Sequence, residues 1–272
     1  MYSADETKQH IIELFRSNVK GHRADVAGRN IHHDGRKGHW LEERFGIVAN
    51  GDNAPDLWGY ELKNETTSKT TFGDWSANVY VFTDSRYSRF FAGSAKFEKQ
   101  DSFVRIFGRP NPAKNGRYSW SGIPCPKINQ YNPLGQILLI RANHDIVAEY
   151  SYSMDQRPDK SVIVPRGLQL EHLAIATWYG ERLPVGVRAK CLKEKLEDKF
   201  DQNGWFTCKT DANGIYDRIC FGDPINWQQW LRMVNAGIVF FDSGMYEGNK
   251  RPYSQWRADN RLWNSLIVEE YR

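Results

Sequence analysis

Apolar residues near the start of the chain recur at the spacing of an amphipathic helix. The pattern predicts a helix over residues 5–19 and a short helix over residues 38–45, each with an apolar side. The apolar positions are Ile11, Ile12, Leu14, Phe15 and Val19 in the first helix, and Trp40, Leu41 and Phe45 in the second. Gly46 then acts as a stop signal for the second helix.

Strand-like segments make up much of the remaining chain. Alternation and an enrichment in β-branched and aromatic residues predict strands over 60–63, 78–83, 103–107, 136–141, 146–152, 205–210, 215–221 and 238–241. Loops are predicted over 20–37, mostly over 108–133, and over 242–259. The order of elements indicates an α/β protein without the regular βαβ rhythm of a dinucleotide-binding fold.

Four further segments complete the prediction. A charged helix is expected over 188–200 and another helix over 223–235, with Asp223 as N-cap and Pro224 in its first turn. The apolar run 171–178 fits either a helix or a strand, and so does the segment 260–271.

Composition narrows the class of protein. With 272 residues and 40% hydrophobic residues, the chain can bury a sizeable core, and no apolar run approaches the length of a membrane span. The start of the chain lacks the basic and apolar regions of a secretory signal, and no two cysteines are spaced as a zinc-binding pair. We therefore expect a cytoplasmic protein with reduced thiols, and we interpret the His32-His33 pair as solvated.

The net charge of +4 permits binding to a polyanion without requiring it. The most informative candidate chemistry lies between Asp56 and Lys63. A run of turn-forming residues precedes Asp56, and in the predicted strand after it Glu61 and Lys63 point to the same side. Two carboxylates can hold a hard cation such as Mg2+, and a lysine beside them can orient water and stabilise developing negative charge. The alternative interpretation is solvated surface charge.

The surroundings of these residues make the pattern more specific. Leu41-Glu42 and Phe45-Gly46 close the second helix, and Asp56 and Glu61-Leu62-Lys63 follow it. This order resembles the active-site region of MvaI/BcnI-type restriction endonucleases, relatives of the repair nickase MutH within the PD-(D/E)XK nuclease superfamily. Glu43 does not match the pattern and is interpreted as surface charge. The resemblance implies an α/β fold with a mixed central sheet flanked by helices.

The resemblance also implies an enzyme and a cofactor. The expected activity is that of a type II restriction endonuclease, a Mg2+-dependent and site-specific deoxyribonuclease. By this resemblance Asp56, Glu61 and the Leu62 carbonyl hold the metal, Lys63 positions the attacking water, and Glu42 contacts the metal or its water shell. Two alternatives remain open, a MutH-like mismatch-repair nickase and a DNA-binding protein with an inactive nuclease fold.

A second and weaker match lies near the C-terminus. Residues 235–242 precede a long basic and aromatic segment that resembles the family element for reading bases in the major groove. The candidate DNA-binding residues there are Lys250, Arg251, Tyr253, Gln255 and Arg257. Arginine is the usual partner of guanine. Phosphate contacts are expected from the basic segments 20–36 and 105–117, which supply affinity that depends on salt.

The resemblance further implies how the protein is organised and what it acts with. It implies a monomer with two lobes that clamp double-stranded DNA, a short target such as CC-N-GG, and a companion DNA methyltransferase that protects host sites. We expect the catalytic lobe to comprise roughly residues 1–110 with parts of 134–200, and the recognition lobe to include roughly 205–272.

Overall fold

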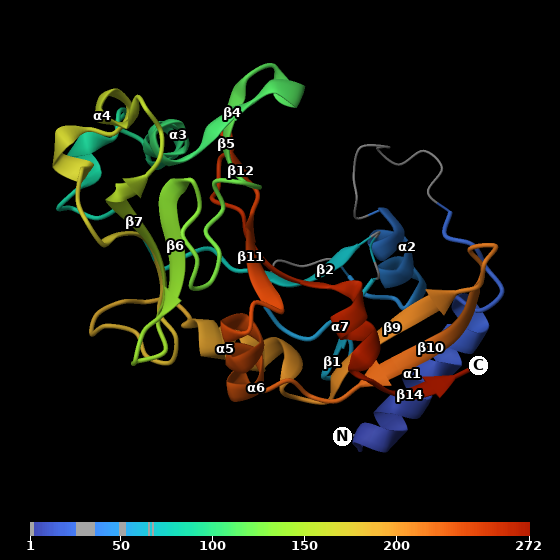
Figure 1. The fold of residues 1–272 in the computed structure, drawn as a ribbon. Helices are drawn as coiled ribbons and strands as arrows, with labels where there is room; N and C mark the ends of the chain where they lie inside the picture. The colour runs from blue at the N-terminus through green and yellow to red at the C-terminus, as the bar shows by residue number, and fades with distance from the viewer. Residues whose placement is uncertain (1–2, 26–35, 49–52, 65, 67) are drawn as a thin grey trace. The chain divides into compact units, whose positions relative to one another are not determined.

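The computed structural model describes residues 3–25, 36–48, 53–64, 66 and 68–272 (Figure 1). The chain divides into two compact units, and each is made of separate segments. The first unit comprises Met1–Thr70, Lys195–Trp230 and Ala258–Arg272, and the second comprises Thr71–Glu194 and Leu231–Arg257. The His32-His33 pair and most of the predicted loop over 20–37 lie outside the described residues.

A mixed four-stranded sheet forms the centre of the first unit, with strand order β1-β9-β10-β14. Strand β1 pairs with β9 in parallel, whereas β10 pairs with both β9 and β14 in antiparallel fashion. The elements of this unit are α1 (Ala4–Asn18), α2 (Arg36–Arg44), β1 (Tyr60–Leu62), β9 (Gly204–Thr210), β10 (Tyr216–Gly222), α7 (Asn260–Ser265) and β14 (Ile267–Tyr271). This arrangement matches the mixed sheet with flanking helices that the family resemblance implies.

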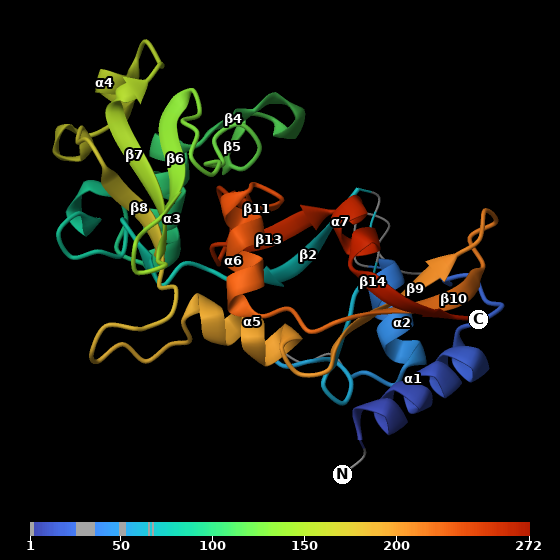
Figure 2. The same ribbon diagram turned by 60° about the horizontal axis from the view of Figure 1, so that its bottom comes forward.

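Helices α1 and α2 share one apolar core with the sheet (Figure 2). Leu62 of β1 and Phe206 of β9 lie side by side in the register and belong to this core. Neighbouring side chains on a strand alternate between faces, so Trp205 lies on the opposite face, where it contacts Trp263 of α7 with ring centroids 5.1 Å apart. Glu61, which pairs with Trp205 in the register, therefore also points away from α1 and α2.

The predicted helices over 5–19 and 38–45 are present as α1 and α2, with their ends shifted by one or two residues. Ser3 caps α1 in a capping box with Glu6, because each residue accepts a backbone hydrogen bond from the other. Helix α2 ends at Arg44, and Gly46 follows with a φ of +71°, a backbone conformation that favours glycine.

Antiparallel pairing dominates the second unit. A four-stranded sheet has the order β3-β8-β7-β6, and a three-stranded sheet has the order β12-β5-β4. Its elements are β3 (Val79–Tyr80), η1 (Ser88–Phe90), α3 (Lys96–Phe107), β4 (Arg109–Asn111), η2 (Pro112–Lys114), β5 (Arg117–Trp120), β6 (Leu134–Ile140), β7 (Ile146–Asp155), α4 (Lys160–Ile163), η3 (Arg166–Leu168), β8 (Leu173–Trp178), β11 (Val239–Ser243) and β12 (Met245–Tyr246).

Four elements belong in part to each unit: β2 (Lys69–Asp74), α5 (Leu192–Phe200), α6 (Trp227–Asn235) and β13 (Ser254–Asp259). Strands β11, β13 and β2 form a third sheet in that order. A continuous aromatic cluster fills the core of the second unit, in which Phe103 contacts Trp120 and Trp178 contacts Trp256 with ring centroids 5.0 and 5.5 Å apart. Aromatic rings of this size bury a large apolar area and dominate the stability of such a core.

The predicted strand over 103–107 is wrong, because these residues form the last turns of helix α3. Phe103 and Phe107 are four residues apart and both are buried, which is the spacing of one helix face. The helix begins upstream, where Glu98 accepts hydrogen bonds from the backbone of Ser94 and Ala95. The β-branched and aromatic composition therefore favours a strand locally, and tertiary packing on a helical face overrides it.

Two other predictions near the C-terminus need correction. Helix α6 begins at Trp227, and its cap is Asn226, whose side chain accepts a hydrogen bond from the Gln229 backbone at 2.9 Å, so Asp223 is not the N-cap. The predicted loop over 242–259 contains strands β12 and β13. Buried and partly exposed residues alternate along β13, as in a half-buried strand. The polar residues around this segment favour a loop in the sequence and hide the alternation.

The bounds of the compact units differ from those of the predicted lobes. Residues 71–110 were expected with the catalytic lobe but belong to the second unit, whereas residues 205–230 belong to the unit that contains Asp56. The assignment of catalysis to one unit and recognition to the other stays a prediction. Within the described part of the chain, no helix is long and apolar enough to cross a membrane, and the four cysteines are buried and form no disulfide.

Candidate active site

A tight turn brings Asp56 back over strand β1. Leu57 and Tyr60 exchange two backbone hydrogen bonds of 3.0 and 2.9 Å, and the two residues between them, Trp58 and Gly59, have φ values of +47° and +86°. Positive φ at both central positions is the signature of a type I′ hairpin turn, which is uncommon for a tryptophan. Asn203 fixes the turn from outside, because its side chain donates to the Trp58 carbonyl at 3.0 Å.

This turn gives a specific prediction about Gly59. A Cβ atom at this position would lie 2.8 Å from the Asn203 side chain, in a backbone conformation that side chains rarely adopt. We expect Gly59→Ala to lower the free energy of unfolding by about 1–2 kcal/mol. Urea unfolding measures the change. Gly116→Ala is the matched control for stability, because Gly116 also has positive φ but meets no neighbouring atom. Equal destabilisation by the two substitutions would contradict the close approach of Asn203 to Gly59.

The Asp56 carboxylate lies beside the segment Glu61-Leu62-Lys63. Its Oδ2 accepts a hydrogen bond from the Leu62 backbone N–H at 3.0 Å. Burial, followed by the nearby Glu61 carboxylate, raises the pKa of Asp56 to about 7, although Lys63, Lys199 and the Leu62 N–H act in the opposite direction. The structure therefore places Asp56 and Glu61 close enough for their charges to repel.

Glu61 and Lys63 point to the same side of β1, as the period of a strand predicts. Their side chains form an ion pair of 2.7 Å between Glu61 Oε1 and Lys63 Nζ, and both are buried. The same Glu61 oxygen lies 3.0 Å from Nζ of Lys199, from the last turn of α5. Asp56, Glu61, Lys63 and Lys199, all from the first unit, are called the Glu61 cluster below.

Lys63 is held in an environment that disfavours its charge. Its Nζ lies 5.0 Å from the ring centroid of Phe200, which directly follows Lys199. Burial, with a smaller contribution from the Lys199 ammonium, lowers the pKa of Lys63, while Glu61 and Asp56 partly offset that effect. A lysine with a lowered pKa exchanges protons more readily near neutral pH.

Glu42 lies on α2, as predicted, but makes a different contact. Its Oε2 is 3.0 Å from Nδ1 of His39, one turn earlier on the same helix. Among the contacts of the described residues, none joins Glu42 directly to Asp56, Glu61 or Lys63. A role for Glu42 at the water shell of a metal stays a prediction.

One atom of the Glu61 cluster, Oε2 of Glu61, is suited to binding a divalent cation. Glu61 Oε2 is buried and has no hydrogen-bond partner among the described atoms, and a buried carboxylate oxygen of this kind needs a polar partner or a cation. No group of three or more His, Cys, Asp and Glu side chains is placed to hold a metal in the described ranges. Mg2+ commonly binds through only one or two carboxylates and completes its shell with water and phosphate oxygens.

The position of Asp56 predicts how pH affects stability in metal-free buffer. The pKa of Asp56 rises from its ordinary 3.8 to about 7 on folding, so the folded protein binds more protons and stability falls as pH rises through this window. Relative to Asp56→Asn, the wild type should lose up to about 2–3 kcal/mol between pH 5 and pH 8. Urea unfolding of both proteins in EDTA measures the difference. An equal pH dependence would contradict the placement of Asp56.

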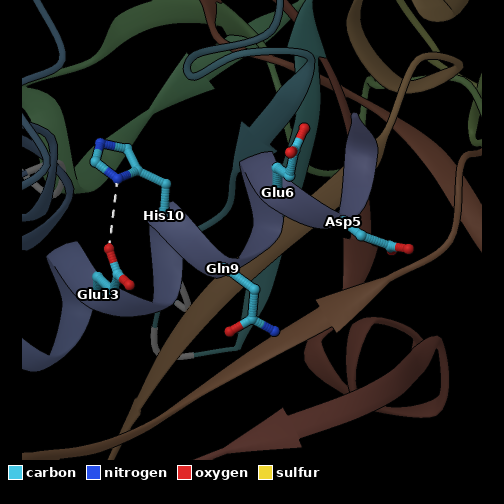
Figure 3. Close-up of a pocket in the computed structure, with 5 residues that line it drawn as sticks. All are labelled: Asp5, Glu6, Gln9, His10 and Glu13. Carbon is cyan, nitrogen blue, oxygen red and sulfur yellow. Dashed lines mark ion pairs between the residues drawn. The ribbon is translucent and has the colours of Figure 1, made fainter. Parts of the chain in front are cut away.

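A separate pocket of about 390 Å³ lies on α1 and is lined by Asp5, Glu6, Gln9, His10 and Glu13 (Figure 3). His10 lies 3.6 Å from Glu13, and its ring is 4.8 Å from that of Trp58. None of the predicted site residues lines the pocket. Its acidic lining repels phosphate, so we do not assign it to substrate binding.

In the second unit, Gln255 and Arg257 lie on strand β13 rather than in a loop. Trp256 between them is fully buried, so the two polar side chains share the opposite face of the strand. Arg257 Nη1 donates to Asp242 Oδ2 of β11 at 3.0 Å, which orients the guanidinium. Asp242, Gln255 and Arg257 form what we call the β13 polar face.

The other predicted DNA-binding residues lie just before this strand. Lys250, Arg251 and Tyr253 are exposed, and the Arg251 guanidinium lies 4.4 Å from the Tyr253 ring centroid while it pairs with Asp74. All five candidates therefore belong to the second unit and lie on or next to β13.

The fold matches that of a restriction endonuclease of known structure. The chain superimposes on the solved structure described as "Restriction endonuclease MvaI-cognate DNA substrate complex" with a TM-score of 0.56 and 13% identity, over 100% of this chain and 98% of that one. At this identity the likeness establishes the restriction-endonuclease fold.

Sequence comparison identifies the family. The model of the LlaMI restriction endonuclease family matches residues 19–271. The chain is also 62% identical over 264 residues to the type II restriction enzyme ScrFI of Lactococcus lactis subsp. cremoris, covering 96% of this chain and 97% of that enzyme. The chain belongs to the LlaMI restriction endonuclease family. The predicted class, a type II restriction endonuclease that acts on DNA, is confirmed, and the MutH-like alternative is not favoured.

One member of the Glu61 cluster was not predicted from the sequence. Lys199 lies in a segment interpreted only as a charged helix, far along the chain from Asp56. The parallel pairing of β1 with β9, just after α5, brings it to Glu61. No local spacing in the sequence could have indicated this approach.

Proposed function

We propose that this protein hydrolyses phosphodiester bonds of double-stranded DNA at a short specific site, with Mg2+ as cofactor and the Glu61 cluster as the catalytic centre. The observation that carries the proposal is the convergence of Asp56, Glu61 and Lys63. Lys63 pairs with Glu61 Oε1, and the second carboxylate oxygen of Glu61, Oε2, is buried and has no hydrogen-bond partner among the described residues. The chemistry of two carboxylates and one lysine fits metal-assisted hydrolysis.

Each residue has a distinct role in this proposal. Asp56 and Glu61, with the Leu62 carbonyl, would hold Mg2+, which supplies a Lewis acid for the scissile phosphate and lowers the pKa of the attacking water. Lys63 would orient that water and stabilise the negative charge that develops on the phosphate oxygens. The Leu62 N–H orients Asp56 toward the same point. Glu42 would act from α2 through the surrounding water.

The second unit supplies the residues proposed to contact DNA. Gln255 and Arg257 of the β13 polar face, with Lys250, Arg251 and Tyr253, are proposed to read bases in the major groove. Arginine held in place by a carboxylate, as Arg257 is by Asp242, is well suited to a bidentate contact with guanine.

The hairpin of β4 and β5 is proposed to bind phosphates. Arg109 and Lys114 are exposed on it, and the Arg117 guanidinium lies 3.6 Å from the Tyr246 ring centroid on the same three-stranded sheet. Arg105, from the preceding helix, pairs with Glu247. Such contacts supply affinity without sequence information. The expected contribution of residues 20–36 concerns a segment that is largely outside the described residues.

The remaining parts of the proposal follow from the family resemblance. We propose a monomer that clamps its DNA between two lobes, recognises a target such as CC-N-GG, and works with a companion methyltransferase that protects host DNA. The four cysteines are buried and form no disulfide within the described residues, which is compatible with a reducing cytoplasm.

A plasmid digest tests the proposed function. Purified protein with Mg2+ should convert plasmid DNA to discrete fragments with one common end sequence, and EDTA should abolish the reaction. Sequencing of the fragment ends gives the target and the cut position. Size-exclusion chromatography with light scattering checks the monomer. Absence of cleavage with Mg2+, Mn2+ or Co2+ would overturn the proposal.

A further inference from the structure

The Glu61 carboxylate is paired with two positively charged side chains. Its Oε1 atom lies 2.7 Å from the Lys63 ammonium and 3.0 Å from the Lys199 ammonium, and only 3% of the Glu61 side chain is exposed. These two ammonium groups offset the negative charge of the buried carboxylate when no metal is bound. The two ammonium groups also repel a third cation at the same oxygen.

The two lysines differ in their freedom to move. The Lys63 side chain is 8% exposed, directly follows the last residue of β1 and packs against the Phe200 ring. The Lys199 side chain is 18% exposed and extends from the last turn of α5. Lys199 is therefore the group that can leave Glu61 at the lower cost.

DNA binding would add negative charge next to the Glu61 cluster. A scissile phosphodiester that approaches Asp56 and Glu61 brings negative charge next to two carboxylates. An ammonium that already lies at Glu61 can move to a phosphate oxygen over a short distance and form a charge-assisted hydrogen bond. That movement frees Glu61 Oε1 for a divalent cation, which also binds phosphate oxygens.

We propose that Lys199 is an exchangeable counter-ion of Glu61, which disfavours metal binding in free protein and transfers to the scissile phosphate when DNA binds. Lys199 is then a positioning residue that makes metal loading depend on substrate. The inference rests on the proposed function, because it takes Glu61 as a metal ligand. Free enzyme would hold little metal, which limits hydrolysis to DNA that is already seated in the site.

Two binding measurements with Lys199→Met test the inference. Without DNA, the affinity for Mn2+, followed by electron paramagnetic resonance of free Mn2+, should rise at least about tenfold, since one repelling charge is removed from the site. In EDTA, the affinity for a duplex with the cognate site should fall by about fivefold or more, since one phosphate partner is lost. A merely structural loss would weaken both affinities.

Two further variants serve as controls. Lys199→Arg keeps the positive charge and should retain weak metal binding without DNA. Lys193→Met removes a lysine from the first turn of the same helix and should leave both affinities unchanged. Equal or weaker Mn2+ binding by Lys199→Met, or unchanged duplex binding in EDTA, overturns the counter-ion role. The plasmid digest with wild-type protein separates the two proposals. If the wild type cleaves plasmid DNA but Lys199→Met does not show both expected changes in affinity, this inference is rejected and the proposed function stands.

Discussion

Asp56→Ala should lower the rate of DNA cleavage by about a thousandfold or more while specific DNA binding persists. The reason is that Asp56 is one of only two carboxylates in the Glu61 cluster, and loss of a metal ligand removes several kcal/mol of transition-state stabilisation. Binding to the cognate duplex in EDTA should be unchanged or tighter, because the repulsion between the carboxylate and phosphate is relieved. Single-turnover cleavage and filter binding measure the two effects.

The matched control is Glu13→Ala, which removes an exposed carboxylate from α1 in the same unit. This variant should cleave at the wild-type rate. Glu61→Ala and Lys63→Ala should behave like Asp56→Ala in cleavage, since both belong to the same cluster. If Asp56→Ala cuts DNA at a rate near that of the wild type, the assignment of the metal site is wrong.

The core of the candidate site could be predicted because its information is local. Asp56, Glu61 and Lys63 lie within eight consecutive positions, and the period of a strand fixes the relative direction of Glu61 and Lys63. The turn that brings Asp56 over Leu62 needs only the residues between them, including Gly59 with its positive φ. Such short-range geometry depends little on the rest of the chain.

Features that depend on distant contacts were not predictable in this way. Lys199 reaches Glu61 only because β1 pairs with β9 in parallel, and no property of α5 indicates that pairing. The segment 103–107 becomes helical because Phe103 and Phe107 pack against Trp120 and Tyr150 of other elements. Arg257 lies on a strand because β13 finds neighbours in β11 and β2. In each case the deciding interaction joins residues far apart in the sequence.

The same argument explains why the sequence does not reveal the bounds of the two compact units. The chain leaves the first unit after Thr70, returns at Lys195, leaves again after Trp230 and returns at Ala258. Each passage occurs within a helix or strand, so no linker composition marks it. A sequence read for linkers rich in glycine, proline or serine therefore detects none of these boundaries.

Arg257→Ala should weaken binding to the cognate duplex by about 5- to 150-fold and leave binding to a scrambled duplex nearly unchanged. A bidentate contact between arginine and guanine is worth about 1–3 kcal/mol of discrimination, and only the cognate duplex offers it. The structure motivates the choice, because Asp242 holds the Arg257 guanidinium on a face that the buried Trp256 fixes in direction. Fluorescence anisotropy with both duplexes in EDTA, at two salt concentrations, measures the effect.

Lys114→Ala provides the contrast that makes this measurement decisive. Lys114 is exposed on the hairpin of β4 and β5, so its loss should weaken both duplexes alike and reduce the slope of affinity against salt by about one. Asp242→Asn should reproduce part of the Arg257→Ala effect, because the guanidinium then loses its charged partner. Should Arg257→Ala instead lower affinity equally for both duplexes, the arginine binds the backbone, and base readout has to be sought among residues 105–117.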